Sequence, residues 1–186
     1  MLSMSILRLC LRPALKVHMS NNFTQAIKFT LPWETGRDKN GNLREDGGYT
    51  NDPRDPGGET KWGISKRYHP DVDIKNLTLE GAMPIYQQEY FDIYKTLKTY
   101  PIDLDSIDTA SAVVIFDTGV NCGVGRTANW YRQVAQKEKP AKELLAIRKQ
   151  FYLDKHNPTY EKGWIARVVD LDKYITILMD ASPVKV

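Results

Sequence analysis

Four polar side chains in the first third of the chain have the types and the order needed for acid-assisted cleavage of a glycosidic bond. Glu34 follows Trp33 at the end of an apolar stretch, and Asp52, Asp55 and Thr60 follow in a turn-rich segment. Such cleavage needs a carboxylic acid that stays protonated near neutral pH, and usually a second carboxylate or a positioned water on the opposite face of the sugar. Apolar surroundings favour the protonated form, which makes Glu34 the candidate acid.

The candidates for the second group lie after Glu34. Asp52 and Asp55 each precede a proline, which stiffens the local backbone and so aims the side chain. An Asp at such a place commonly just bonds its own backbone in a turn, so neither residue is diagnostic alone. We expect Thr60 to hold the attacking water if the reaction inverts the anomeric carbon. Trp62 and Tyr49 are the candidates for contact with the sugar.

A helix must position Glu34. Apolar residues repeat at four-residue spacing along this segment: Phe23, Ile27 and Leu31. Asn21 or Asn22 is placed to cap the first turn, and Pro32 should kink or end the helix near Leu31. If one more turn continues past the proline, Glu34 projects from the same side as the apolar stripe.

Residues 35–61 are rich in Gly, Asp, Asn and Pro, which indicates irregular or β structure. Two hairpin-like excursions fit, one turning at Asn40-Gly41 and one at the Asp-Pro pairs. The run DKNGN at 38–42 has oxygen-bearing residues at alternate positions, as a calcium loop does. Its glycine is misplaced, however, and position twelve is Tyr49 instead of a bidentate Glu, so we interpret the run as a hairpin turn.

The remaining sequence has helical periodicity almost throughout. We expect helices near 62–68, 78–98, 106–121, 126–137, 140–155 and 162–179. Thr78 is the expected cap of the second, Gly123 and Gly125 should end the third, and Pro140 suits a first helical position. Tyr86, Tyr90 and Tyr94 share one face of the helix at 78–98 and are interpreted as core. The predicted fold is mainly α with a small β-hairpin region near the N-terminus.

Length and composition limit the class of protein. The 186 residues fit one compact domain, and apolar residues at 41% and charged residues at 26% are ordinary for a globular protein. No apolar run is long enough to span a bilayer, and a net charge of +3 suits an anionic polymer but is too small to indicate nucleic-acid binding.

Cysteine and histidine spacing predicts no disulfide framework, metal site or cofactor. The cysteines are Cys10 and Cys122, and the histidines are His18, His69 and His156. The histidines are scattered, so structural or surface roles are expected. Residues 1–18 mix Leu and Ile with basic residues, which fits either a weak export signal or an extension ahead of Met19.

Residues 47–65, GGYTNDPRDPGGETKWGIS, resemble the signature of glycoside hydrolase family 108, the bacterial and phage N-acetylmuramidases. FDTGVNCG at 116–123 and GWIARV at 163–168 resemble the helical C-terminal half of that family, a predicted peptidoglycan domain. The resemblance implies a lysozyme-like fold in which 19–100 form the catalytic part with its β-rich loop. Residues 101–180 would be the helical part, packed into the same globule, and 1–18 an extension of uncertain role.

The chain departs from the family at the catalytic residue. In the family the catalytic Glu stands immediately before Gly-Gly-Tyr, whereas here residues 35–46 separate Glu34 from Gly47. Glu45 is nearer to Gly47, but no apolar helix leads to it, so we interpret 35–46 as an insertion and favour Glu34. With the insertion set aside, Glu34, Asp55 and Thr60 follow in the acid, carboxylate and threonine order of phage-type lysozymes, which favours Asp55 over Asp52.

The resemblance implies a muramidase that hydrolyses the β-1,4 bond between N-acetylmuramic acid and N-acetylglucosamine without a cofactor. Its partner would be the glycan strands of peptidoglycan, with no nucleic acid, no stable membrane insertion and a monomeric state. It would act in the periplasm or cell wall, as a bacterial remodelling enzyme or as a phage endolysin released through a holin. The alternatives are a lytic transglycosylase and a non-catalytic peptidoglycan-binding protein. Arg167 is expected to bind a muramyl carboxylate or, more simply, to tie the last helix to Asp117.

Overall fold

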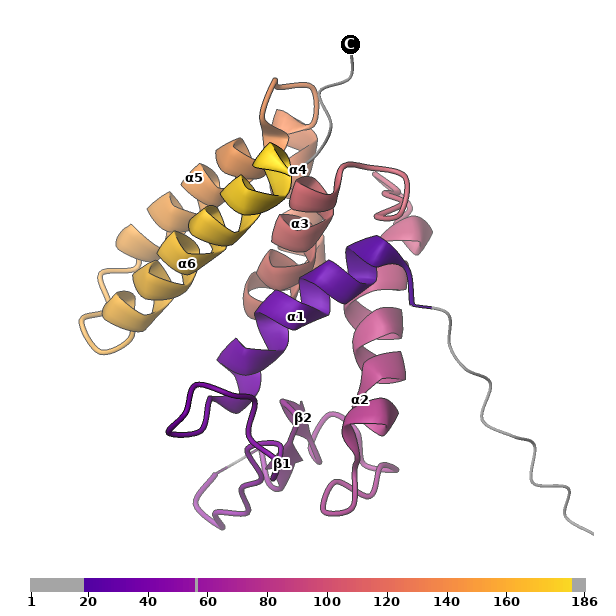
Figure 1. The fold of residues 1–186 in the computed structure, drawn as a ribbon, viewed down its shortest axis with the longest axis vertical. Coiled ribbons are helices and arrows are strands. Elements are labelled where there is room, and N and C mark those ends of the chain that lie inside the picture. The colour runs from indigo at the N-terminus through magenta and orange to yellow at the C-terminus, as the bar shows by residue number, and fades with distance from the viewer. Residues whose placement is uncertain (1–18, 56, 182–186) are drawn as a thin grey trace, which may run out of the picture.

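The computed structural model describes residues 19–55 and 57–181, so the expectations for residues 1–18 lie outside the described residues. The fold is mainly α with one small antiparallel sheet, as predicted (Figure 1). The helices are α1 (Asn21–Thr35), α2 (Leu79–Tyr86), α3 (Thr109–Cys122), α4 (Val124–Val134), α5 (Pro140–Leu153) and α6 (Glu161–Asp180). The strands are β1 (Thr60–Lys61) and β2 (Ile64–Ser65), with Thr60 opposite Ser65 and Lys61 opposite Ile64.

Helix α1 continues one turn beyond its proline. Ser20 caps it by accepting a hydrogen bond from the Phe23 N–H (3.2 Å). The predicted cap Asn22 is instead buried, and its amide donates to Leu104 O (2.7 Å), so the predicted cap was wrong. Past Pro32 the last turn is secured by burial of Leu31 and Thr35. Pro32 therefore does not end the helix: the further turn that the sequence left open is present, and Glu34 lies inside it.

Helix α3 is the centre of the molecule. Every residue from Ala110 to Gly119 is buried, and α1, α4, α5 and α6 all pack against the helix (Figure 1). The helix is apolar because it is buried on all sides over this stretch, as the sequence predicted. Gly123 ends α3, but α4 begins at the next residue, so the prediction that Gly125 helps to end α3 was wrong.

We expect Gly119→Ala to destabilise the protein by about 1–3 kcal/mol, the usual cost of overpacking a well-packed core. A Cβ at this position would overlap the hydroxyl oxygen of Tyr94, which is fully buried and donates to Ile115 O (3.2 Å). Urea unfolding measures the change. Gly125→Ala is the matched control, because a Cβ there meets nothing within 4 Å and Ala stabilises helix interiors. An unchanged Gly119→Ala midpoint would contradict the close contact.

The segments on either side of α2 differ from their predictions. The prediction of a helix at 62–68 was wrong, because this segment contains the turn and the second strand of the β1–β2 hairpin. In the turn, Trp62 (φ 54°) and Gly63 (φ 73°) lie in the left-handed region. The single helix expected at 78–98 is instead α2, a π-helical turn at Gln87–Phe91 and a 3-10 turn at Asp92–Thr96. Thr78 caps α2 as predicted, with its hydroxyl accepting from the Gly81 N–H (3.1 Å).

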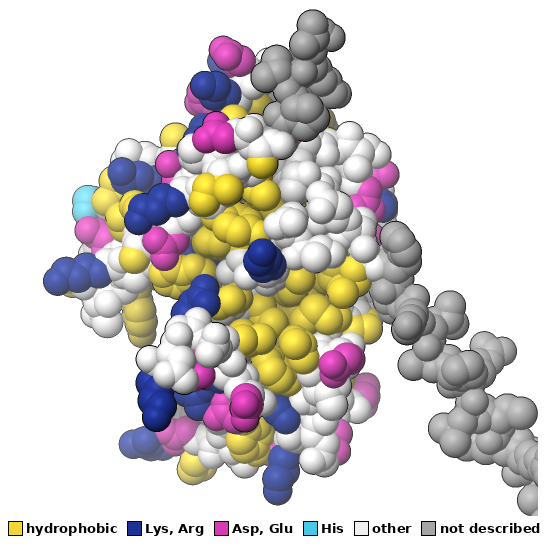
Figure 2. Space-filling model, viewed as in Figure 1, with side chains coloured by type: hydrophobic (Ala, Val, Ile, Leu, Met, Phe, Trp, Pro, Cys, Tyr) yellow, Lys and Arg dark blue, Asp and Glu magenta, His cyan; other side chains and the backbone are white. Residues whose placement is uncertain are grey.

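Helices α5 and α6 lie side by side as a pair against α3, and Pro140 begins α5 as predicted (Figure 1). Figure 2 shows apolar side chains gathered in the middle of the face on which α1 and α6 lie. On α6, Val169 (41%) and Ile177 (68%) remain exposed. Over the described part of the chain, no helix has both the length and the apolar character needed to cross a bilayer.

Candidate active site

A cavity of about 310 Å³ lies where the end of α1, the β1–β2 hairpin, the π-helical turn and the end of α3 meet. Glu34 enters it from the last turn of α1. The wall around Glu34 consists of Gly63, Ile64, Ser65, Tyr68, His69, Tyr86, Glu89, Tyr90 and Val120. The Glu34 side chain is 23% exposed, so it neither points into open water nor is sealed from it.

The Gly-Gly-Tyr turn packs directly against the end of α1. A Cβ at Gly48 would lie 2.6 Å from the carbonyl oxygen of Thr35, and a Cβ at Gly47 would overlap the indole of Trp62. Only glycine permits both approaches. Residues 36–46 therefore leave the helix end and return to it, as an insertion would. The hairpin predicted at Asn40-Gly41 is present within it, since the Asp38 N–H donates to Asn42 O (2.9 Å).

This return places Glu34, and not Glu45, beside the cavity. Glu45 is exposed on the excursion and is not among the residues that line the cavity. Glu34 therefore lies near the Gly-Gly-Tyr turn in space, although residues 35–46 separate the two in sequence.

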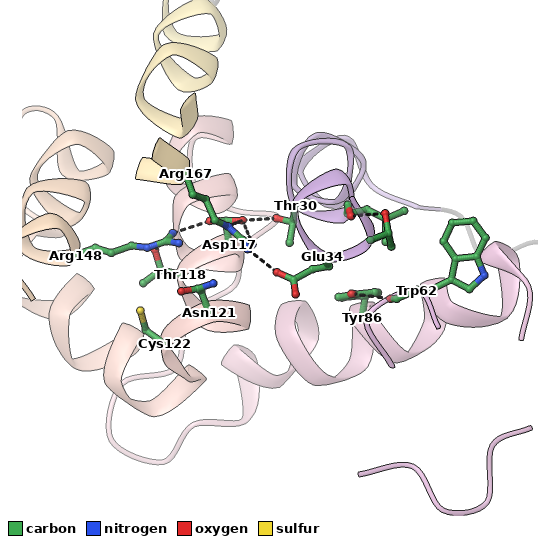
Figure 3. A network of polar contacts seen from close by, with 12 residues as sticks. Thr30, Glu34, Trp62, Tyr86, Asp117, Thr118, Asn121, Cys122, Arg148 and Arg167 are labelled. Carbon is green, nitrogen blue, oxygen red and sulfur yellow. Dashed lines mark hydrogen bonds and ion pairs between the residues drawn. The ribbon is translucent and has the colours of Figure 1, made fainter. Parts of the chain in front are cut away.

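Glu34 is one end of a buried chain of charges (Figure 3). Arg167 of α6 lies 2.7 Å from Glu34 Oε1 and 2.6 Å from Asp117 Oδ1, and Arg148 of α5 lies 2.6 Å from Asp117 Oδ2. Thr30 donates to the same Asp117 (2.9 Å). The prediction that Arg167 ties the last helix to Asp117 is confirmed. The niche of Glu34 is therefore not wholly apolar, because a guanidinium forms one side of it.

In this network of buried charges, the attraction between opposite charges outweighs the cost of burying them. Burial alone would lower the pKa of Arg167, but the charges of Asp117 and Glu34 raise it above its ordinary value. Burial likewise raises the pKa of Tyr86, and the negative charge of Glu34 raises it further. Tyr86 therefore remains a neutral hydroxyl, which donates to Trp62 O (2.9 Å) beside Glu34.

Asp52, Asp55 and Thr60 belong to a separate turn and do not line the cavity around Glu34. Asp52 binds Arg54 (2.7 Å), and this hydrogen-bonded pair lowers the pKa of Asp52. Asp55 accepts from the Gly57 N–H (2.7 Å). Thr60 exchanges two backbone hydrogen bonds with Thr50 (2.9 Å each), which closes the second predicted excursion.

The two expected sugar contacts are also engaged elsewhere. Trp62 is 6% exposed, its indole N–H donates to Leu77 O (3.0 Å), and Figure 3 shows the ring directed away from Glu34. The Tyr49 hydroxyl donates to Glu59 (2.8 Å). Neither side chain lines the cavity. Tyr86 and Tyr94 are core residues as expected, whereas Tyr90 is partly exposed in the cavity wall.

Sequence reasoning missed the groups opposite Glu34. His69 Nε2 lies 2.9 Å from Glu89 Oε1, and both residues line the cavity with Tyr90. A scattered histidine and a glutamate in a helical segment carry no motif of their own. The one available signal was spacing, because Glu89 follows Tyr86 by three residues on a helical face. Within residues 19–55 and 57–181, no grouping of three or more His, Cys, Asp or Glu side chains has the proximity needed to hold a metal.

We expect Gly63→Ala to lower glycosidase activity about tenfold or more, because displacement of a catalytic group by about 1 Å has costs of this order. A Cβ at Gly63 would overlap the Tyr86 hydroxyl and lie 3.1 Å from Glu34 Cβ, in a backbone conformation that side chains rarely adopt. Initial rates on purified cell wall measure the effect. Gly58→Ala controls for backbone strain alone, since its φ is also positive but its nearest neighbour is Lys66 Cβ at 3.8 Å. Equal loss in both variants would contradict a role specific to the cavity.

Comparison with known proteins agrees with this geometry. The chain aligns with the solved structure of SagA from Brucella abortus at a TM-score of 0.55 and 19% identity, covering 88% of this chain and 97% of that one. At this identity the likeness shows the shared fold. No curated protein sequence matches the chain.

A family model matches part of the chain. The sequence model described as Glycosyl hydrolase 108 matches residues 41–123, which include the Gly-Gly-Tyr turn, the hairpin and the cavity walls from α2 to α3. Glu34 lies before the matched segment but packs against it. The resemblance inferred from the sequence is thus confirmed by a match to the model of that family, which residues 41–123 of the chain resemble.

Proposed function

We propose that the protein is a muramidase, which hydrolyses the β-1,4 bond from N-acetylmuramic acid to N-acetylglucosamine in peptidoglycan, with Glu34 as its general acid. The observation that carries the proposal is the position of Glu34. It projects from α1 into a cavity whose other lining residues all lie within 41–123, the part of the chain that matches the family model. A carboxyl group at 23% exposure is accessible to a substrate oxygen and still shielded from bulk water.

In this mechanism Glu34 protonates the bridging oxygen as the glycosidic bond breaks. The carboxylate that forms lies 2.7 Å from the Arg167 guanidinium, which stabilises the negative charge as it develops. Arg167 is held in turn by Asp117, so its position does not depend on Glu34 alone. Fixed charge at the reacting centre requires little reorganisation during the reaction.

The roles of Asp55, Asp52 and Thr60 stay predictions. Their side chains are occupied in the turn at 50–60, and binding of a glycan would have to reorganise this turn before any of them reached a sugar at Glu34. The same holds for Trp62 and Tyr49 as sugar contacts. Tyr90 and Tyr68 are better placed to contact a glycan, since both line the cavity and Tyr68 is 76% exposed.

Digestion of purified cell wall tests the proposed reaction. A muramidase releases N-acetylmuramic acid at the new reducing end, which borohydride converts to muramitol before mass spectrometry. A lytic transglycosylase would give 1,6-anhydro-muramyl ends that borohydride leaves unchanged. Release of glucosaminitol would assign the other glycosidic bond, and wall binding without product release would mean a non-catalytic binding protein; each of these three results overturns the proposal.

The site of action follows from the substrate. A glycosidase of this family acts on the cell wall. We propose that the wall is reached either as a phage endolysin released through a holin or as a bacterial remodelling enzyme. Expression from inside a host cell with and without a holin, followed by turbidity, separates the two: lysis only with the holin indicates an endolysin.

A further inference from the structure

A second carboxylate, Glu89, lies in the same cavity as Glu34 and on another element. Glu34 enters from α1, whereas Glu89 belongs to the π-helical turn Gln87–Phe91, and both line one space of about 310 Å³. Glycoside hydrolysis commonly uses two carboxyl groups beside the bond that breaks, and Glu34 and Glu89 line one space.

The π-helical turn sets the direction of Glu89. A π-helical turn has one more residue than an α-helical turn, so the side chains that follow it point in directions that differ from those in a regular α-helix. Such turns occur often at functional sites. Here the turn places Glu89 and Tyr90 together in the cavity wall, while Phe91 is buried in the core. Tyr90 is close enough to both carboxylates to interact with their charges: burial raises its pKa, and the charges of Glu89 and Glu34 raise it further.

His69 holds Glu89 in place. The ring is 15% exposed, with Nδ1 3.3 Å from Ser65 O and Nε2 2.9 Å from Glu89 Oε1. The carbonyl oxygen of Ser65 can only accept, so Nδ1 is the donor on that side. Nε2 faces Glu89 Oε1, so the ring is held between Ser65 and Glu89. The Glu89 side chain is 45% exposed, so water can reach it.

We propose that Glu89, oriented by His69, is the general base that activates the water in this reaction. The inference rests on the proposed function, because it assigns the second group of the glycosidase site. It differs from the sequence-based expectation, in which Asp55 or Asp52 has this role. Those carboxylates are bound within their own turn, whereas Glu89 shares the cavity with Glu34.

The proposed step is a single displacement by water at the anomeric carbon. Glu89 takes a proton from water while the water oxygen forms a bond to the anomeric carbon. The bond from this carbon to the bridging oxygen breaks, and that oxygen takes the proton of Glu34. Glu34 ends as a carboxylate and Glu89 as a carboxylic acid, and proton exchange with solvent restores both. Because water attacks from the face opposite the leaving group, the β-linked substrate yields an α product.

The decisive variant is Glu89→Ala, measured on purified glycan strands with Glu80→Ala as its matched control and with Asp55→Ala as the test of the sequence-based expectation. We expect kcat to fall about 10²-fold or more in Glu89→Ala with little change in KM, because loss of a general base has effects of this size. Glu80→Ala should stay within a few-fold of the wild type, because Glu80 is exposed in the first turn of α2 and does not line the cavity. Sodium azide should restore turnover of Glu89→Ala, since this anion fits the vacated space and attacks without a base, and the product should be an α-glycosyl azide.

His69 is a positioning residue, and two substitutions of different severity test this role. His69→Gln retains a donor to Glu89 and should keep most of the turnover, whereas His69→Ala should lower kcat about tenfold with unchanged KM. Equal activity of His69→Ala and the wild type would remove His69 from the proposal. Circular dichroism of each variant confirms that a loss of activity does not reflect unfolding.

Three results would overturn the inference while the proposed function stands. These are a Glu89→Ala variant with near-wild-type kcat, an Asp55→Ala variant with the larger loss, and a wild-type product that is initially the β anomer by proton NMR. Failure of the proposed function looks different, because the wild type itself would then release no muramitol. The two failures are therefore distinguishable in the same set of digests.

Discussion

Replacing Glu34 by Gln should lower peptidoglycan hydrolysis by about 10²- to 10⁴-fold, the range associated with loss of a general acid. Gln fills the same volume but has no carboxyl proton to donate to the bridging oxygen. Stability should change by no more than about 1 kcal/mol, because the amide oxygen of Gln can still accept from Arg167 and Arg167 keeps its second partner, Asp117. Turbidity loss and muramitol release measure activity, and urea unfolding measures stability.

Glu45→Gln is the matched control for this experiment. Glu45 is the nearer glutamate to Gly47 in sequence, but it is exposed on the excursion 36–46 and lies outside the cavity. We expect this variant to retain wild-type activity. An inactive Glu45→Gln beside an active Glu34→Gln would move the acid to Glu45 and would require the excursion to fold back over the cavity.

Local patterns in the sequence were sufficient to predict the elements that carry Glu34. The spacing of Phe23, Ile27 and Leu31 reflects the buried face of α1, and a turn-rich excursion follows Glu34 as expected. Such signals are local because helical periodicity and turn residues act over a few positions. The same is true of Thr78 and Pro140, whose capping and first-turn roles depend only on their own backbone.

The second half of the site was not predictable in this way. Glu89 lies on a π-helical turn after α2 and shares the cavity with Glu34. His69 contacts Glu89 from the segment after the hairpin, where a helix was predicted. Both features depend on tertiary packing. Trp62 shows the reverse error: a tryptophan beside a motif suggested a sugar platform, but Gly47 leaves room for it to be buried.

Asp117 was visible in the sequence only as a possible partner of Arg167, yet it is the centre of the buried charges. It is fully buried and contacts Arg148 and Arg167, whose side chains are 0% and 6% exposed. Each arginine comes from a different helix of the α5–α6 pair, so Asp117 on α3 joins the pair to the element that most of the fold packs against. Because Arg167 also contacts Glu34, the same contacts support both the fold and the candidate acid.

We expect Asp117→Asn to destabilise the protein by about 3–5 kcal/mol, because removing one partner of a buried ion pair leaves uncompensated charge in the interior. Asn keeps the shape of Asp and can still accept from Thr30, so the effect reports charge more than packing. Activity measured well below the unfolding temperature should also fall, since Arg167 loses the contact that fixes it beside Glu34. Asp170→Asn is the control, because Asp170 is 53% exposed and pairs with Lys173 at 3.7 Å.

The destabilisation should depend on pH in a defined direction. Burial raises the pKa of Asp117, but the charges of Arg167 and Arg148 outweigh it and lower the pKa to about 2. A lowered folded-state pKa contributes stability that is fully present above the unfolded value near 3.8 and is lost as the pH falls through 2. This contribution is on the order of 2 kcal/mol at 1.36 kcal/mol for each pKa unit.

The difference in unfolding free energy between wild type and Asp117→Asn should therefore be constant from pH 7 to 5 and narrow from pH 4 to 2. The Asp170→Asn gap should stay small throughout, and a gap for Asp117→Asn that widens on acidification would mean that the carboxyl group is protonated in the folded protein.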